Sequence, residues 1–144
     1  MRTISQTDLA SKLRITIART ARRLRQEASE DLSPSLTAAL ATVYRHGPLT
    51  PSEVADREHV QRPTATRILA RLEEAGLVAR TRDPQDGRSS LVALTPEGRA
   101  LLERIRTRKD AYLVRRLGEL NAEERATLDR AAQILERLLE GEPR

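Results

Sequence analysis

Three Ser-Pro or Thr-Pro pairs divide this sequence into segments. No other feature of the sequence restricts its possible folds as strongly. The pairs are Ser33-Pro34, Thr50-Pro51 and Thr95-Pro96. The hydroxyl group before each proline can accept a hydrogen bond from a first-turn amide, and proline already has the φ angle that a first helical residue needs. Each pair therefore predicts the start of a helix.

Other local signals mark further helix ends. Glu53 follows Thr50 by three residues, and Glu124 follows Asn121 by the same interval. This spacing predicts a capping box at both sites. Glycine, which adopts the left-handed conformation at little cost, stands where three helices should stop. These residues are Gly47, Gly76 and Gly118.

Between these markers, apolar residues recur every three or four positions, which is the spacing of one helix face. The spacing predicts helices over residues 7–28, 34–46, 51–58, 63–75, 96–117 and 122–139. The pattern changes after Gly76, where residues 77–81 and 89–94 are short and strand-like. Asp83-Pro84 and Asp86-Gly87 are turn signals between them. This segment predicts a β-hairpin with a charged tip.

The predicted fold class is mainly α with a small β-hairpin wing, and the 144 residues suit a single chain of one domain with helical extensions. Residues 33–94 are predicted to form a compact unit of three helices with the hairpin as its wing. Residues 7–30 and 96–140 supply flanking helices with apolar faces too wide to be covered by so small a unit. We therefore expect these helices to pair with a second copy and form a homodimer.

The composition narrows the possible partners. The net charge is +5, and the basic residues comprise 24 Arg and only 2 Lys. This bias favours bidentate recognition of phosphates, carboxylates or guanine edges. Tyr44 and Tyr112 are the only aromatic residues, so stacking of unpaired bases on aromatic rings is disfavoured. The composition therefore disfavours single-stranded nucleic acid as a partner bound by stacking.

Several classes of protein are disfavoured. The chain has no Cys and two His, so the sequence predicts no metal site, and we expect no cofactor. A glycine-rich phosphate loop and a nucleophile paired with His are both missing, so the chain is not expected to be an enzyme. No apolar run approaches the roughly 18 residues of a membrane span, and the N-terminus does not resemble a signal peptide. We expect a cytoplasmic protein without membrane contact.

Residues 51–76 predict a helix-turn-helix, in which the second helix enters the major groove of DNA. Arg67 and Arg71 are four residues apart and should project together, away from the apolar face. Arg can bind guanine O6 and N7, and Thr64 and Thr66 are short enough to contact a base or a thymine methyl. A bidentate pair contributes roughly 1 to 3 kcal/mol of discrimination.

Each of these residues has an alternative explanation. Arg67 and Arg71 could be ordinary solvent-facing residues, but the segment 61–88 holds six Arg against four acids. Arg88, at the hairpin tip, could enter a narrow minor groove or could pair with a nearby Asp in the turn. Thr50 and Ser52 could contact a phosphate from a helix N-terminus, although capping alone would explain Thr50.

Five segments together closely resemble the MarR family of winged helix-turn-helix regulators. They are residues 49–55 (LTPSEVA), 62–69 (RPTATRIL), 72–78 (LEEAGLV), 83–88 (DPQDGR) and 94–98 (LTPEG). The resemblance covers nearly the whole chain. It implies a homodimer in which the terminal helices interlock and two winged units bind a pseudo-palindromic operator. Where many helix-turn-helix proteins place Gly, this chain has His59, which is expected in the left-handed region.

The resemblance also implies roles for individual residues. Major-groove contacts would come from the recognition helix, the minor-groove contact from Arg88, and ordering of the wing from Asp86. The full expected DNA interface is Thr50, Ser52, Arg62, Pro63, Thr64, Thr66, Arg67, Arg71, Arg82, Asp86 and Arg88. Many members of the family release DNA when a small aromatic or phenolic ligand binds between the dimer helices and the winged unit. Candidate ligand contacts are Ile17, Leu40, Tyr44 and His46.

The sequence thus predicts a dimeric, sequence-specific regulator of transcription that binds double-stranded DNA and acts as a repressor. An alternative is a winged-helix protein-interaction module that does not bind DNA. Such a module would have no salt-sensitive affinity for any duplex. The six Arg around the predicted wing favour the regulator.

Overall fold

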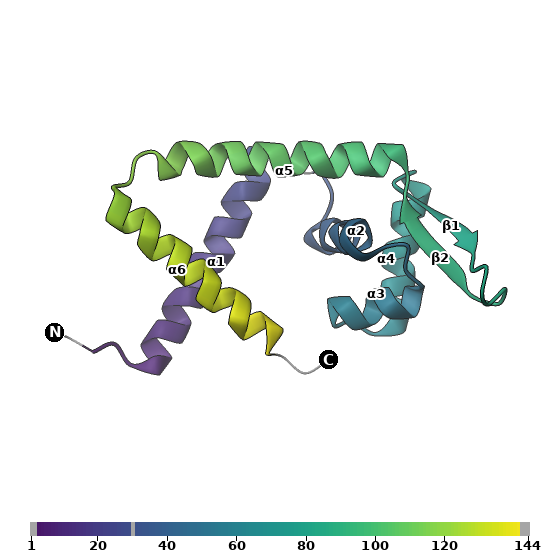
Figure 1. Ribbon diagram of the computed structural model, residues 1–144, viewed down its shortest axis with the longest axis horizontal. Coiled ribbons are helices and arrows are strands. Elements are labelled where there is room, and N and C mark those ends of the chain that lie inside the picture. The colour runs from purple at the N-terminus through teal and green to yellow at the C-terminus, as the bar shows by residue number, and fades with distance from the viewer. Residues whose placement is uncertain (1–2, 30, 142–144) are drawn as a thin grey trace.

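The computed structural model describes residues 3–29 and 31–141 of the chain. Its elements are α1 (Gln6–Glu27), α2 (Pro34–His46), α3 (Pro51–Glu58), α4 (Arg62–Glu74), β1 (Val78–Arg82), β2 (Ser90–Leu94), α5 (Pro96–Leu117) and α6 (Ala122–Glu140). Figure 1 shows the long helix α5 joining two parts of the molecule: α1 and α6 lie on the side of one of its ends, and α2, α3, α4 and the hairpin gather at the other. The predicted mainly helical fold with a hairpin wing is confirmed.

The Ser-Pro and Thr-Pro pairs do begin helices. Ser33, Thr50 and Thr95 are the N-caps of α2, α3 and α5, and each side chain accepts a hydrogen bond from a first-turn amide. The Thr50–Glu53 and Asn121–Glu124 capping boxes are both present. These boundaries were predictable because the donor and acceptor of each cap lie within three residues.

The glycine prediction is only partly correct. Gly76 has a φ of 74° and ends α4 in the left-handed region, as predicted. Gly47 has a φ of −73° and Gly118 a φ of −64°, so both end their helices without entering that region. Gly47 is extended because it precedes Pro48, and a residue before proline is pushed toward β geometry.

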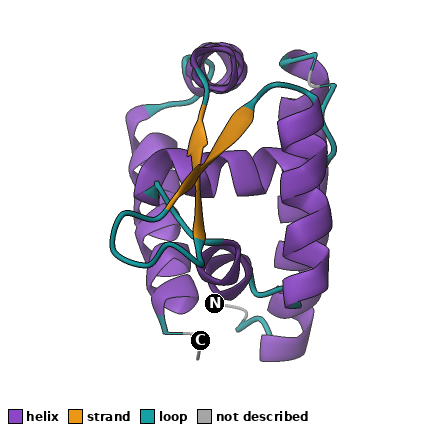
Figure 2. Ribbon diagram, turned by 90° about the vertical axis from the view of Figure 1, so that its right-hand side faces the viewer, coloured by secondary structure: helices purple, strands orange, loops and turns teal. Residues whose placement is uncertain are grey.

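The hairpin is antiparallel, and its register runs from Val78 opposite Leu94 to Arg82 opposite Ser90. Each strand begins one residue later than predicted. Figure 2 views the molecule from the hairpin side and shows the two strands crossing in front of the helices. Leu49 forms a further antiparallel bridge with Val92, which ties the α2–α3 connection to β2.

One core holds the winged unit together, and it is built from aliphatic side chains as the composition requires. It joins α2, α3, α4, the hairpin and the first turns of α5. Its buried residues are Ala39, Leu40, Val43, Leu49, Val54, Leu69, Leu72, Leu77, Val78, Val92 and Leu102. Burial of each large aliphatic side chain contributes about 1.5–3 kcal/mol.

The helices α1 and α6 differ from the rest, because neither has a buried residue in the single chain. Most of their large apolar side chains are exposed, and Leu138 and Leu139 are 64% and 68% exposed. Within the described residues, no helix combines the length and apolar character needed to cross a membrane.

Candidate DNA-binding surface

The helix-turn-helix is formed by α3, a short turn and α4. The turn depends on His59, which has a φ of 55° and a ψ of 41° and therefore lies in the left-handed region. A non-glycine residue is uncommon there, although His is one of the residues that tolerate it best. The expected conformation of His59 is confirmed, and the helix begins at Arg62, one residue earlier than predicted.

The two faces of α4 separate apolar from basic residues. Ala65, Leu69 and Leu72 are buried against the core. Arg67 and Arg71 are exposed on the other side, as are Arg62, Pro63 and Thr66, whereas Thr64 is half-buried. The separation follows from helical periodicity, because residues four apart lie on the same face.

Hydrogen bonds arrange the polar side chains along α4. The Thr66 hydroxyl donates to the backbone oxygen of Arg62 at 3.0 Å, which turns its oxygen toward the helix. The Nη2 atom of Arg67 donates to the Thr64 hydroxyl at 3.4 Å. Arg67 therefore lies along the start of the helix, where a recognition helix meets base edges.

The tip of the wing is ordered by its two Asp residues. Asp86 accepts hydrogen bonds from the backbone amide of Arg88 at 3.0 Å and from the Ser89 hydroxyl at 3.3 Å. Asp83 accepts one from the amide of Gln85 at 2.9 Å. Both carboxylates bond within the turn, and among the described residues no ion pair holds the Arg88 guanidinium. Arg88 is exposed at the end of a tightly bonded turn.

At the start of α3, the Thr50 hydroxyl accepts a hydrogen bond from the amide of Glu53 at 3.2 Å, so its oxygen is used in the cap. Ser52, in the first turn, is half-buried. The cap explains Thr50 fully, and a contact with phosphate by either residue stays a prediction.

An ion pair that the sequence did not indicate joins the wing to α4. The Nε atom of Arg80 lies 2.7 Å from a carboxylate oxygen of Glu73. Side chains alternate between the two faces of a strand, so Arg80 and Arg82 lie on the same face of β1 as the buried Val78. Both arginines are exposed. Arg80 therefore holds the wing against the recognition helix, and Arg82 projects from the same side of the hairpin. Arg80 and Glu73 are seven residues apart and lie on different elements. No local pattern in the sequence predicts such a pair.

The four candidate ligand contacts do not lie together. Leu40 is fully buried in the core, whereas Ile17 is 48% exposed on α1. Tyr44 lines a cavity between α2 and α5. His46 lines a different cavity, between α2 and α3.

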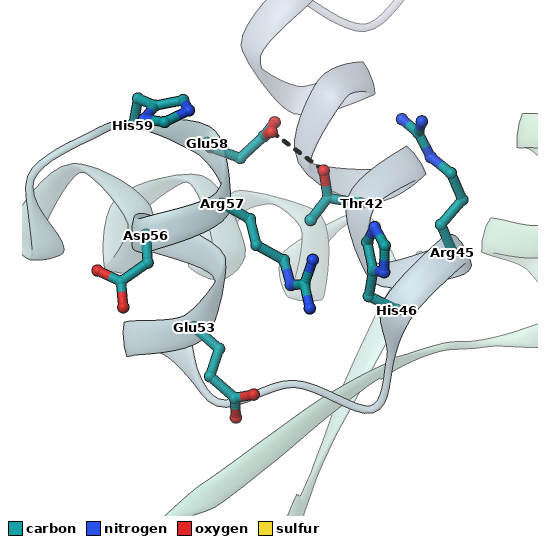
Figure 3. Close-up of a pocket in the computed structure, with 8 residues that line it drawn as sticks. All are labelled: Thr42, Arg45, His46, Glu53, Asp56, Arg57, Glu58 and His59. Atoms are coloured by element: carbon teal, nitrogen blue, oxygen red, sulfur yellow. Dashed lines mark hydrogen bonds between the residues drawn. The ribbon is translucent and has the colours of Figure 1, made fainter. Parts of the chain in front are cut away.

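Figure 3 shows the cavity that contains His46. It has a volume of about 690 Å³ and is lined by Thr42, Arg45, His46, Glu53, Asp56, Arg57, Glu58 and His59. The Thr42 hydroxyl donates to Glu58 at 3.0 Å, while the Arg57 and His46 side chains approach from opposite helices. Every lining residue is polar, whereas small-molecule sites are mostly apolar. This cavity is therefore the weaker candidate for an aromatic ligand.

The cavity that contains Tyr44 has a mixed lining. Its volume is about 320 Å³, and its walls are Thr37, Ala41, Tyr44, Arg45, Leu102, Ile105, Arg106 and Lys109. The guanidinium carbons of Arg99 and Arg106 lie 5.5 and 5.4 Å from the centre of the Tyr44 ring. The site therefore offers an aromatic ring and an aliphatic floor beside several cations. The sequence did not indicate Arg45 and Arg106 at this site, because α2 and α5 meet only in the folded chain.

Two arginines of α1 have partners within the protein. Arg23 forms an ion pair of 2.6 Å with Glu27, and Arg25 donates to the backbone oxygen of Leu32 at 3.0 Å. A hydrogen bond to the Tyr112 side chain, together with the charge of Glu27, raises the pKa of Arg23 above its ordinary value.

The helix-turn-helix, the exposed arginines of α4 and the ordered hairpin beside them define a winged helix-turn-helix protein of the DNA-binding class. Residues 32–90 match the model of the MarR family. The HTH-type transcriptional regulator ML2140 of Mycobacterium leprae (strain TN) is 36% identical to this chain over 140 residues, which cover 96% of this chain and 98% of that protein. The chain belongs to the MarR family, and it is a DNA-binding regulator of transcription.

Solved structures agree with this assignment. A transcriptional regulator protein from Pseudomonas aeruginosa PA01 has 34% sequence identity and a TM-score of 0.80, with 97% of this chain and 100% of that chain covered. The PcaV transcriptional regulator from Streptomyces coelicolor, solved in complex with its natural ligand, has 26% identity and a TM-score of 0.70. That comparison covers 98% of this chain and 99% of PcaV.

Proposed function

We propose that this protein is a homodimeric repressor that binds a pseudo-palindromic operator in double-stranded DNA. The observation that carries the proposal is the arrangement of two unlike surfaces at opposite ends of α5. Exposed arginines lie on α4 and the wing at one end, and uncovered apolar faces lie on α1 and α6 at the other. A repressor would act from the cytoplasm, where its operator lies, by excluding polymerase from a promoter.

The proposed division of labour follows the fold. Residues 33–94 bind DNA, and the helices of residues 7–30 and 96–140 form the dimer through their apolar faces, although residue 30 lies outside the described part of the chain. The side chains that support dimerisation are large, apolar and exposed in the single chain. They are Ile4, Leu9, Leu13, Ile15, Ile17, Val114, Leu128, Ile134, Leu138 and Leu139. So many exposed apolar side chains are typical of a surface that is covered by a partner.

Two-fold symmetry determines what kind of DNA site is expected. A dimer places its recognition helices in successive major grooves, so the half-sites should be inverted and about 34–36 Å apart. Selection of bound duplexes from a random pool tests this directly. An inverted repeat supports the proposal, whereas equal binding of all duplexes at physiological salt would contradict it. Absence of any salt-sensitive binding would favour the interaction module.

Replacement of Arg67 by Ala and replacement of Arg88 by Ala are expected to impair DNA binding in different ways. Arg67→Ala should reduce discrimination at one base pair of each half-site by about 1–3 kcal/mol, because a bidentate base contact is lost. Arg88→Ala should weaken binding to all duplexes and reduce the slope of log K against log salt by about 1. Titrations by fluorescence anisotropy at several salt concentrations measure both effects.

The matched control for both variants is Arg104→Ala, which removes the same charge from an exposed position on α5. It should change neither base preference nor the salt slope. If Arg67→Ala kept the full base preference, its proposed role would be wrong. If Arg88→Ala kept both the affinity and the salt slope, Arg88 would not contact DNA.

A small anionic aromatic molecule is the effector that we propose for the cavity between α2 and α5. Arg45 and Arg106 would hold a carboxylate, and Leu102 and Ile105 would contact its ring. The position of this cavity supports control of DNA binding by the effector, because the cavity lies between α2 of the winged unit and the long helix α5. PcaV, which has the same fold and 26% identity, was solved with its natural ligand.

Thermal unfolding should identify this effector site. A bound 4-hydroxybenzoate, at about 100 times its Kd, stabilises the native state by about 2.7 kcal/mol. For a chain of this length, that raises Tm by at least about 5 °C. The increase should be lost in Arg106→Ala and retained in Arg104→Ala, and the uncharged 4-hydroxybenzyl alcohol should have little effect. An equal increase in Arg106→Ala would place the ligand elsewhere.

A further inference from the structure

A groove beside the recognition helix includes residues that the sequence did not single out. It has a volume of about 250 Å³ and lies between the first turn of α2 and the exposed side of α4. Its walls are Ser33, Ser35 and Leu36 from α2 and Thr64, Arg67, Ile68 and Arg71 from α4. The groove thus combines two guanidinium groups with three hydroxyl groups and has no acidic residue in its lining.

Some polar groups of the groove already form hydrogen bonds within the protein, and others do not. The Ser33 oxygen accepts a hydrogen bond from the amide of Leu36 at 3.3 Å, and Thr64 receives one from Arg67 at 3.4 Å. The Arg71 guanidinium and the Ser35 hydroxyl are exposed, and neither makes a hydrogen bond or ion pair within the described residues. A cation and a hydroxyl group from two different helices are therefore left facing one space.

The position of Arg71 on α4 decides what it can contact. A recognition helix meets base edges with its N-terminal residues, and Arg71 lies more than two turns after the helix begins at Arg62. In duplex DNA the base edges form the floor of the major groove and the phosphates form its rim. An arginine farther along the helix, with its side chain beside another element, is placed for the rim.

We propose that this groove binds a phosphate of the operator backbone, and that Arg71 and Ser35 hold it together. Guanidinium binds phosphate with short charge-assisted hydrogen bonds, and a serine hydroxyl can donate one more. Arg71 is then a phosphate contact, and base recognition on this helix rests on the residues nearer its start. The inference depends on the proposed DNA-binding function and adds α2 to the interface.

The first arm of the test replaces Arg71 and compares the selected inverted repeat with duplexes that carry single base changes. Arg71→Ala should weaken binding to all of these duplexes by about 10-fold near physiological salt and reduce the salt slope by about 0.9, the value for one phosphate. Its order of preference among the duplexes should remain that of the wild type. Arg104→Ala, which removes a charge outside the groove, should behave as the wild type.

The second arm replaces Ser35, which is exposed, so these variants should retain the wild-type Tm. Ser35→Ala should weaken binding about threefold without changing the salt slope, and Ser35→Glu should weaken it more than 10-fold because a carboxylate repels phosphate. Thr107→Glu on α5 makes the same charge change outside the groove and should bind normally. It controls for a general effect of added negative charge.

Two results with the variants would overturn the phosphate assignment alone. If Arg71→Ala lost its preference at a particular base pair, Arg71 would be a base contact. If Ser35→Glu bound the operator as tightly as the wild type, the groove would hold no phosphate. A wild-type protein that preferred no duplex would instead overturn the proposed function, and this assignment with it. The wild-type titration therefore separates the two failures.

Discussion

Replacement of Leu138 by Asp should convert the protein to a monomer and reduce its operator affinity at least 100-fold. Leu138 is 64% exposed in the single chain and lies on the apolar face of α6, a helix without a buried residue. In the proposed dimer this face is covered, so an Asp there places a charge in an apolar interface of each subunit. Each winged unit would then bind DNA on its own. The variant would lose the 100-fold to 10,000-fold gain in affinity that linking two binding units provides.

Sedimentation equilibrium measures the mass of the Leu138→Asp variant, and fluorescence anisotropy measures its affinity for the selected operator. Gln133→Asp makes the same charge change on the opposite side of α6, where Gln133 bonds to Asp129 at 3.2 Å. This control should remain dimeric with wild-type affinity. A Leu138→Asp variant that stayed dimeric at micromolar concentration would show that α6 does not form the interface.

Gly98→Ala should lower the stability of the protein by about 3 kcal/mol, because the new methyl group has no space. A Cβ at this position would lie 2.0 Å from the backbone oxygen of Leu77. That oxygen also accepts a hydrogen bond from the amide of Thr95 at 3.1 Å, and the Thr95 hydroxyl donates to the backbone oxygen of Gly76 at 2.6 Å. The start of α5 is therefore held against the end of α4, and neither backbone can move freely.

The expected effect on Tm is a decrease of about 10 °C for a chain of this length. It should be measured by calorimetry at one fixed protein concentration, because unfolding of a dimer depends on concentration. Gly87→Ala is the matched control, since its Cβ would be 3.7 Å from the nearest side-chain atom, an ordinary contact. An unchanged Tm in Gly98→Ala would mean that α5 can shift away from Leu77 at little cost.

Features of the candidate site could be predicted when the residues involved lie close together in the sequence, and could not be predicted when they lie on different elements. The basic face of α4 follows from helical periodicity, so the exposure of Arg67 and Arg71 was foreseen. The Arg80–Glu73 pair and the association of Tyr44 with Arg99 and Arg106 were not, because each joins two elements. Leu40 was expected beside a ligand, yet it is fully buried because α2 is packed into the core.

The amino-acid sequence alone determined the order of the helices, their caps, the hairpin and the likeness to MarR-family regulators. All of these depend on patterns within a few residues: proline after a hydroxyl residue, apolar spacing, and turn signals around Asp86. Tertiary structure alone decided which cavity contains Tyr44, which groove Arg71 and Ser35 both line, and why Gly98 cannot carry a methyl group. Those contacts join residues from different elements, and their distances exist only once the aliphatic core has brought the elements together.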